Sequence, residues 1–128
     1  MTDLEVLGHV FSAVNGEHSG ITWLRFCDHF CSWEFHRLIE DGQVIGAVLQ
    51  KQREVHIAFF VPRTGSIRRH LRDHLQRVIS EYGFAETYVE RGNDRSHRFC
   101  LRLGFFPVCD AGDAILLRCM KFKYEVSK

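Results

Sequence analysis

Apolar residues recur every three or four positions through the first third of the chain, which predicts two helices. The first is expected to be capped by Asp3 and to end near Asn15-Gly16. The second is expected from Ile21 to about Ser32 and is apolar on two sides, so it should pack against two layers of core, or against the core on one side and a ligand groove on the other. The residues on its two sides are Ile21, Leu24 and Cys31, and Trp23, Phe26, Phe30 and Trp33.

The spacing then changes to alternation, which predicts three strands. These strands are Glu34–Ile39, Gln43–Gln50 and Glu54–Val61. The first two are joined by the tight-turn sequence Glu40-Asp41-Gly42, and the next break is the polar segment Lys51-Gln52-Arg53. Because both connections are short, the strands should form an antiparallel meander.

A long helix is expected after Ser66, which is a good N-cap, and Gly83 should stop it. The remaining elements are a strand at Phe84–Glu90, a short helix at Asp94–Leu103 stopped by Gly104, and strands at Phe105–Cys109 and Ala114–Phe122. This order, ααβββαβαββ, predicts an α/β (α+β) fold with a central mixed β-sheet flanked by helices. With 128 residues and no linker, we expect a single domain over residues 1–128.

The composition excludes several classes of protein. A chain that is 45% hydrophobic and 26% charged is not disordered. The start, MTDLEVLGHV, has acids where a signal peptide is basic, and no apolar run approaches the roughly 20 residues that span a bilayer. We therefore expect a cytoplasmic protein with no membrane partner. Five cysteines, an odd number lying mostly in apolar runs, predict reduced core thiols.

The charges are balanced in total but not along the chain. The formal net charge is +1, yet the window from Arg63 to Arg102 holds nine arginines against five acids. Arg68 and Arg69 fall in the first turn of the long helix, where cations are unfavourable unless an anion binds there. A strand, a Gly loop and a helix in succession present free backbone N–H groups to phosphate. The sequence thus favours a phosphate site here, and a solvated basic face is the alternative.

Metal binding is not expected. Cys27, His29 and Cys31 lack the second pair of ligands of a structural zinc site. His70 and His74 have helical zinc spacing but lack the adjacent glutamate and a third ligand.

The segment from Val89 to Phe105 resembles the C-terminal motif of the GNAT (GCN5-related) N-acetyltransferases, V-x-x-x-N-x-x-A-x-x-F-Y-x-K-x-G-F. The positions in register are Val89, Asn93, Phe99, Gly104 and Phe105, with Ser96 for the small residue and Arg102 for the basic one. The resemblance extends from about Glu34 to Phe122 in element order, with the family's first strand short or missing. It implies transfer of an acetyl group from acetyl-CoA to an amine of a small molecule or a protein.

The resemblance also implies which residues bind acetyl-CoA. It assigns the pyrophosphate to the loop after the third strand and to the start of the long helix. The pantetheine arm is assigned to the end of that third strand, and the short helix that follows Asn93 is assigned to the other side of the cofactor. The residues are Phe60, Val61, Arg63, Thr64, Gly65, Ser66, Ile67, Arg68, Arg69, Asn93, Ser96 and Phe99. The aromatic wall of an acceptor cleft falls, by the same analogy, on Trp23, Phe26, Phe30 and Trp33. Relatives are often dimers, so a homodimer is an open alternative.

Acetyl transfer needs a base for the amine, a donor to the thioester oxygen and a proton for the leaving sulfur. The candidate bases are Glu54 and His56, with Glu90 as runner-up, and each could instead have a structural role. A backbone N–H near Phe60 or Val61 could donate a hydrogen bond to the thioester oxygen. Cys100 stands at the family's tyrosine position as the candidate acid, and Tyr88 is the alternative.

Two departures from the family keep a second function class open. The loop Arg63-Thr64-Gly65-Ser66-Ile67-Arg68 lacks two of the family's small residues, and Cys100 replaces its tyrosine. The enzyme ranks first and a non-catalytic CoA-binding module second. A nucleic-acid-binding protein that uses the arginines of residues 68–77 and 91–102 ranks third, because the net charge is near zero.

Overall fold

The computed structural model describes residues 2–15, 22–60 and 67–120 and contains four helices and six strands in the predicted order. The helices are α1 (Asp3–Asn15), α2 (Trp23–Phe30), α3 (Ile67–Tyr82) and α4 (Asp94–Leu103). The strands are β1 (Glu34–Glu40), β2 (Gln43–Lys51), β3 (Glu54–Phe59), β4 (Ala85–Glu90), β5 (Phe106–Asp110) and β6 (Ala114–Cys119).

All six strands belong to one open mixed sheet, in the order β1-β2-β3-β4-β6-β5. The predicted α/β fold class is thereby confirmed. The chain divides into two compact units, the first formed by Met1–Lys51 and His56–Thr64 and the second by Gln52–Val55 and Gly65–Lys128. The single-domain assignment stays a prediction, and the units are described one at a time below.

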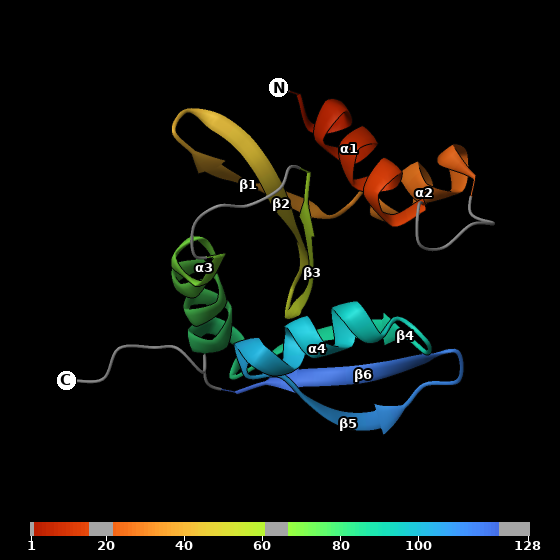
Figure 1. Cartoon of the computed structure of the whole chain (residues 1–128), viewed down its shortest axis with the longest axis vertical. Coiled ribbons are helices and arrows are strands. Elements are labelled where there is room, and N and C mark those ends of the chain that lie inside the picture. Colours follow the sequence, from red (N-terminus) through yellow and green to blue (C-terminus); the bar gives the residue numbers. More distant parts are fainter. Residues whose placement is uncertain (1, 16–21, 61–66, 121–128) are drawn as a thin grey trace. The chain divides into compact units, whose positions relative to one another are not determined.

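In the first unit, α1 and α2 lie next to each other and pack on the inner positions of β2 (Figure 1). The buried cluster consists of Val6, Leu7, Val10, Phe26, Phe30, Trp33, Ala47 and Leu49. The prediction that α2 is apolar on two packed sides is wrong. Leu24 is 79% exposed and Cys31 is also exposed, so only the side with Phe26 and Phe30 enters the core.

The β1–β2 hairpin closes through the predicted tight turn. Asp41 and Gly42 both have positive φ, 53° and 78°, as in the primed turns that match the twist of paired strands. The two strands are antiparallel, and their register shifts between Leu38 and Ile39. Leu38 is buried and Ile39 is 54% exposed, as the alternation of a strand places adjacent side chains on opposite faces.

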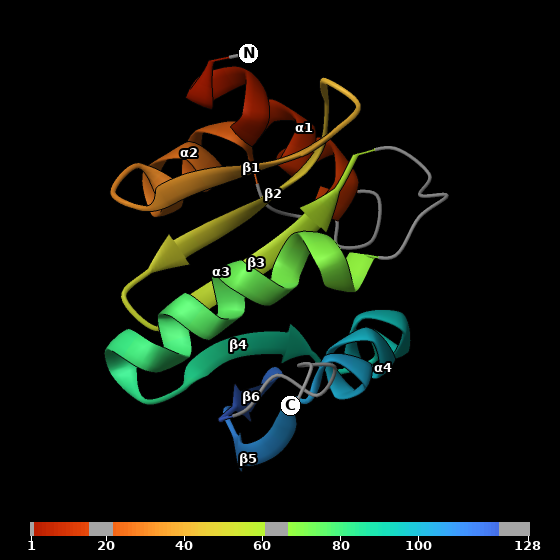
Figure 2. The same ribbon diagram turned by 90° about the vertical axis from the view of Figure 1, so that its left-hand side faces the viewer.

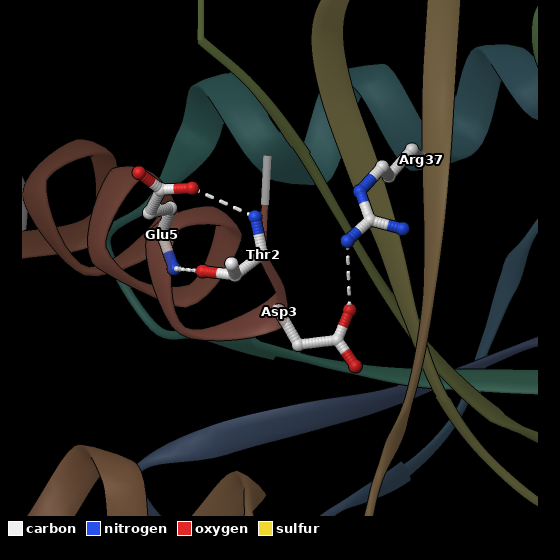
Figure 3. Close-up of polar contacts among 4 residues, drawn as sticks. All are labelled: Thr2, Asp3, Glu5 and Arg37. Carbon is white, nitrogen blue, oxygen red and sulfur yellow. Dashed lines mark hydrogen bonds and ion pairs between the residues drawn. The ribbon is translucent and has the colours of Figure 1, made fainter.

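The first turn of α1 is held by Thr2 and not by Asp3, which corrects the sequence prediction (Figure 3). The Glu5 backbone N–H donates to Thr2 Oγ1 at 3.2 Å, and the Thr2 backbone N–H donates to Glu5 Oε1 at 2.7 Å. This reciprocal pair is a capping box. Asp3 is thereby left to accept a hydrogen bond from the Arg37 guanidinium of β1 at 3.0 Å.

The capping box should make the stability of the protein depend on pH. Hydrogen bonds from the backbone and then the side chain of Thr2 lower the pKa of Glu5. A carboxylate with a lowered folded-state pKa stabilises the fold above its unfolded pKa, and the contribution is lost as the pH falls through the folded value. Glu5→Ala should therefore melt a few degrees below the wild type at pH 7, and the gap should close below about pH 4. Thermal melts across pH test this, and a gap independent of pH would contradict it.

In the second unit, β3 and β4 run parallel, with Glu54 opposite Glu86, and α3 connects them. Helical spacing buries Leu71, Leu75 and Val78 of α3. The predicted stop is also confirmed, since Gly83 has φ 89° and donates its N–H to the Ile79 carbonyl at 2.7 Å. β4 pairs antiparallel with β6, and β6 with β5, so β5 is one of the two edge strands of the sheet (Figure 2).

The five cysteines are free thiols, but they are not all core residues. Cys100 and Cys119 are buried as predicted, whereas Cys31 and Cys109 are exposed. None of the helices in the described part of the chain combines the length and hydropathy needed to cross a membrane.

Candidate functional site

Both ends of α4 are fixed by residues of the sequence motif. Asn93 Oδ1 accepts a hydrogen bond from the Ser96 backbone N–H at 3.2 Å, which satisfies a free donor of the first turn. At the other end Gly104 is left-handed, with φ 112°, and its N–H is directed at the carbonyls of Cys100 and Leu101. Asn93 and Ser96, both assigned to cofactor binding, thus lie together at the start of α4. Phe99 lies one turn further on and is half-buried.

The connection from β4 to α4 is anchored by Arg91, a role that the sequence analysis missed. Its guanidinium pairs with Asp110 and donates from Nε to the Gly112 carbonyl at 2.8 Å. Its backbone N–H donates to the Asp113 carbonyl at 2.9 Å. The side-chain hydrogen bond from Arg91, followed by the Gly112 backbone, lowers the pKa of Asp110. The β5–β6 turn therefore holds the segment that positions Asn93.

Tyr88 and Glu90 lie on one face of β4. Successive strand residues point to opposite faces, and the alternate residues Ala85, Thr87 and Val89 are buried. Tyr88 is 42% exposed and Glu90 is also exposed. Two residues span about 7 Å along a strand, so a candidate acid and a candidate base share an accessible face close to Asn93.

Glu54 lies at the opposite end of β4 from this pair. Its register partner is Glu86, and Glu90 is four residues, or about 13 Å, further along the strand. The Glu86 carboxylate accepts hydrogen bonds from Arg118, the closer at 2.8 Å, and Arg53 lies 3.5 Å from it. This end of the strand holds a packed ion cluster, and the unit does not bring Glu54 together with Tyr88 or Glu90.

Cys100 is on the buried side of β4 and is a weak acid. Its side chain is 7% exposed, and burial, with a smaller contribution from Cys119, raises its pKa to about 12. Cys119 pairs with Ala85, which belongs to the buried face of β4. The two candidate acids, Cys100 and Tyr88, therefore lie on opposite sides of the strand.

His56 and Phe60 belong to the first unit. The His56 ring lies 5.3 Å from Trp33 and 6.1 Å from Phe30, so it packs among aromatic side chains. The Phe60 ring stacks on His9 at 5.1 Å, and its backbone N–H donates to the Ile45 carbonyl at 2.7 Å. That N–H already has an acceptor, which disfavours Phe60 as the donor to a thioester oxygen, and the other residue predicted for this role, Val61, lies outside the described residues.

The predicted aromatic wall of an acceptor cleft is wrong for three of its four residues. Phe26, Phe30 and Trp33 are each less than 10% exposed and contact one another edge-on or tilted, with ring centroids 4.9 Å apart in each neighbouring pair. They form core, and Trp23 alone of the four is accessible, at 36%.

The predicted pyrophosphate loop, Arg63, Thr64, Gly65 and Ser66, lies outside the described residues, as does Val61. Ile67, Arg68 and Arg69 form the first turn of α3. That turn contains no acidic residue, so the positive end of the helix dipole is not neutralised by its own sequence. The start of α3 therefore fits an anionic group. In the described parts of the chain, no three His, Cys, Asp or Glu side chains are grouped so as to hold a metal ion.

No protein-family model matches the sequence, and no curated protein matches it significantly. Solved structures do match. The PaiA N-acetyltransferase of Thermoplasma acidophilum, in complex with coenzyme A, is 13% identical with a TM-score of 0.61, over 94% of this chain and 96% of that one. An acetyltransferase from Agrobacterium tumefaciens is 16% identical with a TM-score of 0.61, over 94% and 86%. A Bordetella pertussis protein assigned to the GNAT family of acetyltransferases is 19% identical with a TM-score of 0.54, over 91% of both chains.

The chain has the GNAT fold. The expectation drawn from the Val89–Phe105 motif is confirmed at the level of the fold. Within the GNAT fold, the strand-to-helix connection at Glu90–Asn93 joins β4 to α4, and the segment preceding α3 follows β3. Within the second unit, β4 runs toward the Glu90–Asn93 connection, and ligands of open α/β sheets bind beyond the carboxyl ends of such strands.

Proposed function

We propose that the protein transfers an acetyl group from acetyl-CoA to an amine. The observation that carries the proposal is the likeness, over 94% of the chain, to an N-acetyltransferase whose structure holds coenzyme A. The start of α3, with no acid in its first turn, supports it independently, since coenzyme A carries a pyrophosphate that such a helix end attracts. The acceptor is an amine of a small molecule or of a protein.

Acetyl-CoA would be bound by residues around two helix starts. The backbone N–H groups of residues 63–69 would receive the pyrophosphate, and Phe60 and Val61 would lie along the pantetheine arm. In the second unit, Asn93, Ser96 and Phe99 would contribute to cofactor binding. Asn93 also caps α4, so its substitution would affect both the helix and the cofactor.

The reaction is a direct attack of the amine nitrogen on the thioester carbonyl carbon, with cleavage of the carbon–sulfur bond. The amine gives up a proton to a base, and the thiolate of coenzyme A takes one from an acid. Glu90 is a better candidate base than Glu54, because Glu90 is exposed at the carboxyl end of β4 whereas Glu54 adjoins the Glu86 ion cluster. His56 remains a candidate in the first unit.

Tyr88 is a better candidate acid than Cys100. A thiol with a pKa of about 12 would have to protonate the thiolate of an ordinary thiol, whose pKa is about 8.5, and that transfer is unfavourable. The Tyr88 hydroxyl belongs to an accessible side chain on the same face as Glu90.

A non-catalytic CoA-binding module is the second candidate. It is favoured by the burial of Cys100 at the position where the family motif has its tyrosine. Both the acetyltransferase and the non-catalytic module would bind acetyl-CoA, and only the acetyltransferase would transfer the acetyl group.

Acetyl-CoA should raise the melting temperature of the protein. Ligand at about 100 times its Kd stabilises a fold by about 2.7 kcal/mol, or roughly 10 °C for a chain of this size. Arg69→Glu, which reverses a charge in the first turn of α3, should reduce the shift, and Arg25→Glu on α2 is the matched control. No shift at millimolar acetyl-CoA would overturn both candidates. Release of free thiol with a panel of amines then separates the enzyme from the binding module.

A further inference from the structure

The exposed face of α4 carries three arginines in a row. At 100° per residue, Arg95, Arg98 and Arg102 fall within an arc of about 60° of the helix, and the seven-residue span is about 10.5 Å long. All three are exposed, whereas Cys100 and Leu103 on the opposite face are buried. Leu101 lies beside the row and is 39% exposed. We refer to Arg95, Arg98 and Arg102 as the arginine row.

The arginine row differs from five of the seven other arginines whose side chains the structure describes; of the remaining two, Arg77 bonds to His74 and Arg25 of α2 has no acidic partner among the described residues. Arg37, Arg53, Arg72, Arg91 and Arg118 each pair with a carboxylate. Within the residues that the structure describes, the three guanidinium groups of the row have no acidic partner. Like charges three and four residues apart destabilise a helix by about 0.2–0.5 kcal/mol per pair. The helix dipole favours only Arg102, in the last turn, and a complementary anionic surface would relieve the repulsion along the whole row.

We propose that the arginine row is a docking surface for an acidic segment of a protein partner. The three guanidinium groups are spread over about 10.5 Å, which is also the spacing of three carboxylates placed three and four residues apart on a facing helix. Each guanidinium group can bind one carboxylate through two parallel hydrogen bonds. Leu101 supplies the apolar contact that accompanies arginine in protein interfaces.

Nucleic acid fits the same surface less well. The row reaches only two or three phosphates, and phosphate neutralisation by so few charges gives weak binding. The two aromatic side chains of α4, His97 and Phe99, are both half-buried, so α4 offers no fully exposed stacking platform for bases. The formal net charge of the whole chain is only +1.

The test is fluorescence anisotropy with a labelled alanine-based helical peptide that carries three glutamates at spacings of three and four. A peptide with glutamine at the same positions is the control ligand. The glutamate peptide should bind the full-length protein at low salt, and its affinity should fall as salt is added.

Arg98→Glu should reduce the affinity of the protein for the glutamate peptide about tenfold, as expected when attraction at one charge pair becomes repulsion. Arg25→Glu, the same charge change on the exposed surface of α2, should alter the affinity less than about twofold. Arg102→Glu serves as a second row variant.

Equal binding of the two peptides, or equal effects of Arg98→Glu and Arg25→Glu, would overturn the proposal. Tighter binding of a duplex oligonucleotide that depends on Arg98 would replace it with a nucleic-acid surface. The proposal is independent of acetyl transfer, so Arg98→Glu should retain the stabilisation by acetyl-CoA. Its loss would assign the arginine row to the cofactor site and would also overturn the proposal.

Discussion

Replacing Gly46 by alanine should lower the melting temperature of the protein by about 10 °C. A Cβ at position 46 would lie 2.4 Å from the Ala58 carbonyl oxygen and 3.1 Å from Phe59 Cα, both of them backbone atoms of β3. Atoms do not approach so closely, and a paired strand backbone cannot move aside as a side chain would. Overpacking of this kind costs about 3 kcal/mol, or roughly 4 °C per kcal/mol in a chain of this length.

Gly8→Ala is the matched control, since it adds the same methyl group in the same unit. Its Cβ would meet only Trp23 Cη2, at 4.0 Å, which is an ordinary contact. Gly8 lies inside α1, where alanine is the better helix former by about 0.5–1 kcal/mol. The two substitutions should therefore shift the melting temperature in opposite directions. A Gly46→Ala protein that melts within a degree of the wild type would show that β2 and β3 are not in such close contact.

The close approach at Gly46 also bears on the proposed cofactor site. The neighbouring residue, Ile45, accepts the Phe60 backbone N–H at 2.7 Å, so the end of β3 is tied to β2 at this point. Phe60 immediately precedes the predicted cofactor loop. A sequence shows Gly46 only as a glycine within a strand pattern, and the reason for it depends on a residue twelve positions away.

Local signals in the sequence were sufficient to predict the elements. The bounds of α4 were predicted without error because Asn93 and Gly104 mark its two ends by capping chemistry. The N-terminus of α1 was assigned to Asp3 because Thr2 and Asp3 are both good caps. The reciprocal bond to Glu5 and the pairing of Asp3 with Arg37 decide between them, and Arg37 is distant in sequence.

The candidate site could be predicted less well, because it depends on register and burial. Glu54 and Glu90 were both candidate bases, and only the pairing of Glu54 with Glu86 places them at opposite ends of β4. Cys100 occupies the motif's tyrosine position, but burial raises the pKa of its thiol to about 12. A thiol with so high a pKa is a poor proton donor to the thiolate of coenzyme A. The apolar residues of α2 were assigned to two packed sides, since hydrophobicity alone does not tell an exposed Leu24 from a buried Phe26.

The choice between the two candidate acids leads to the second large effect. Tyr88→Phe should lower kcat by about 100-fold, the lower end of what general acid–base catalysis contributes, because phenylalanine lacks the hydroxyl that would protonate the leaving thiolate. The ring is retained, so the stabilisation by acetyl-CoA should remain close to that of the wild type. The measurements are thiol release under saturating substrates and thermal melting with and without acetyl-CoA.

Cys100→Ala is the matched control for Tyr88→Phe, because it removes the other candidate proton donor. The buried thiol packs on the face of β4 opposite Tyr88, so its loss should lower the melting temperature while kcat changes by less than about threefold. The reverse result, a large loss of kcat in Cys100→Ala and none in Tyr88→Phe, would make Cys100 the acid and would require its thiol to become accessible during turnover. If neither variant lost activity, the proton for the thiolate would have to come from solvent or from another residue.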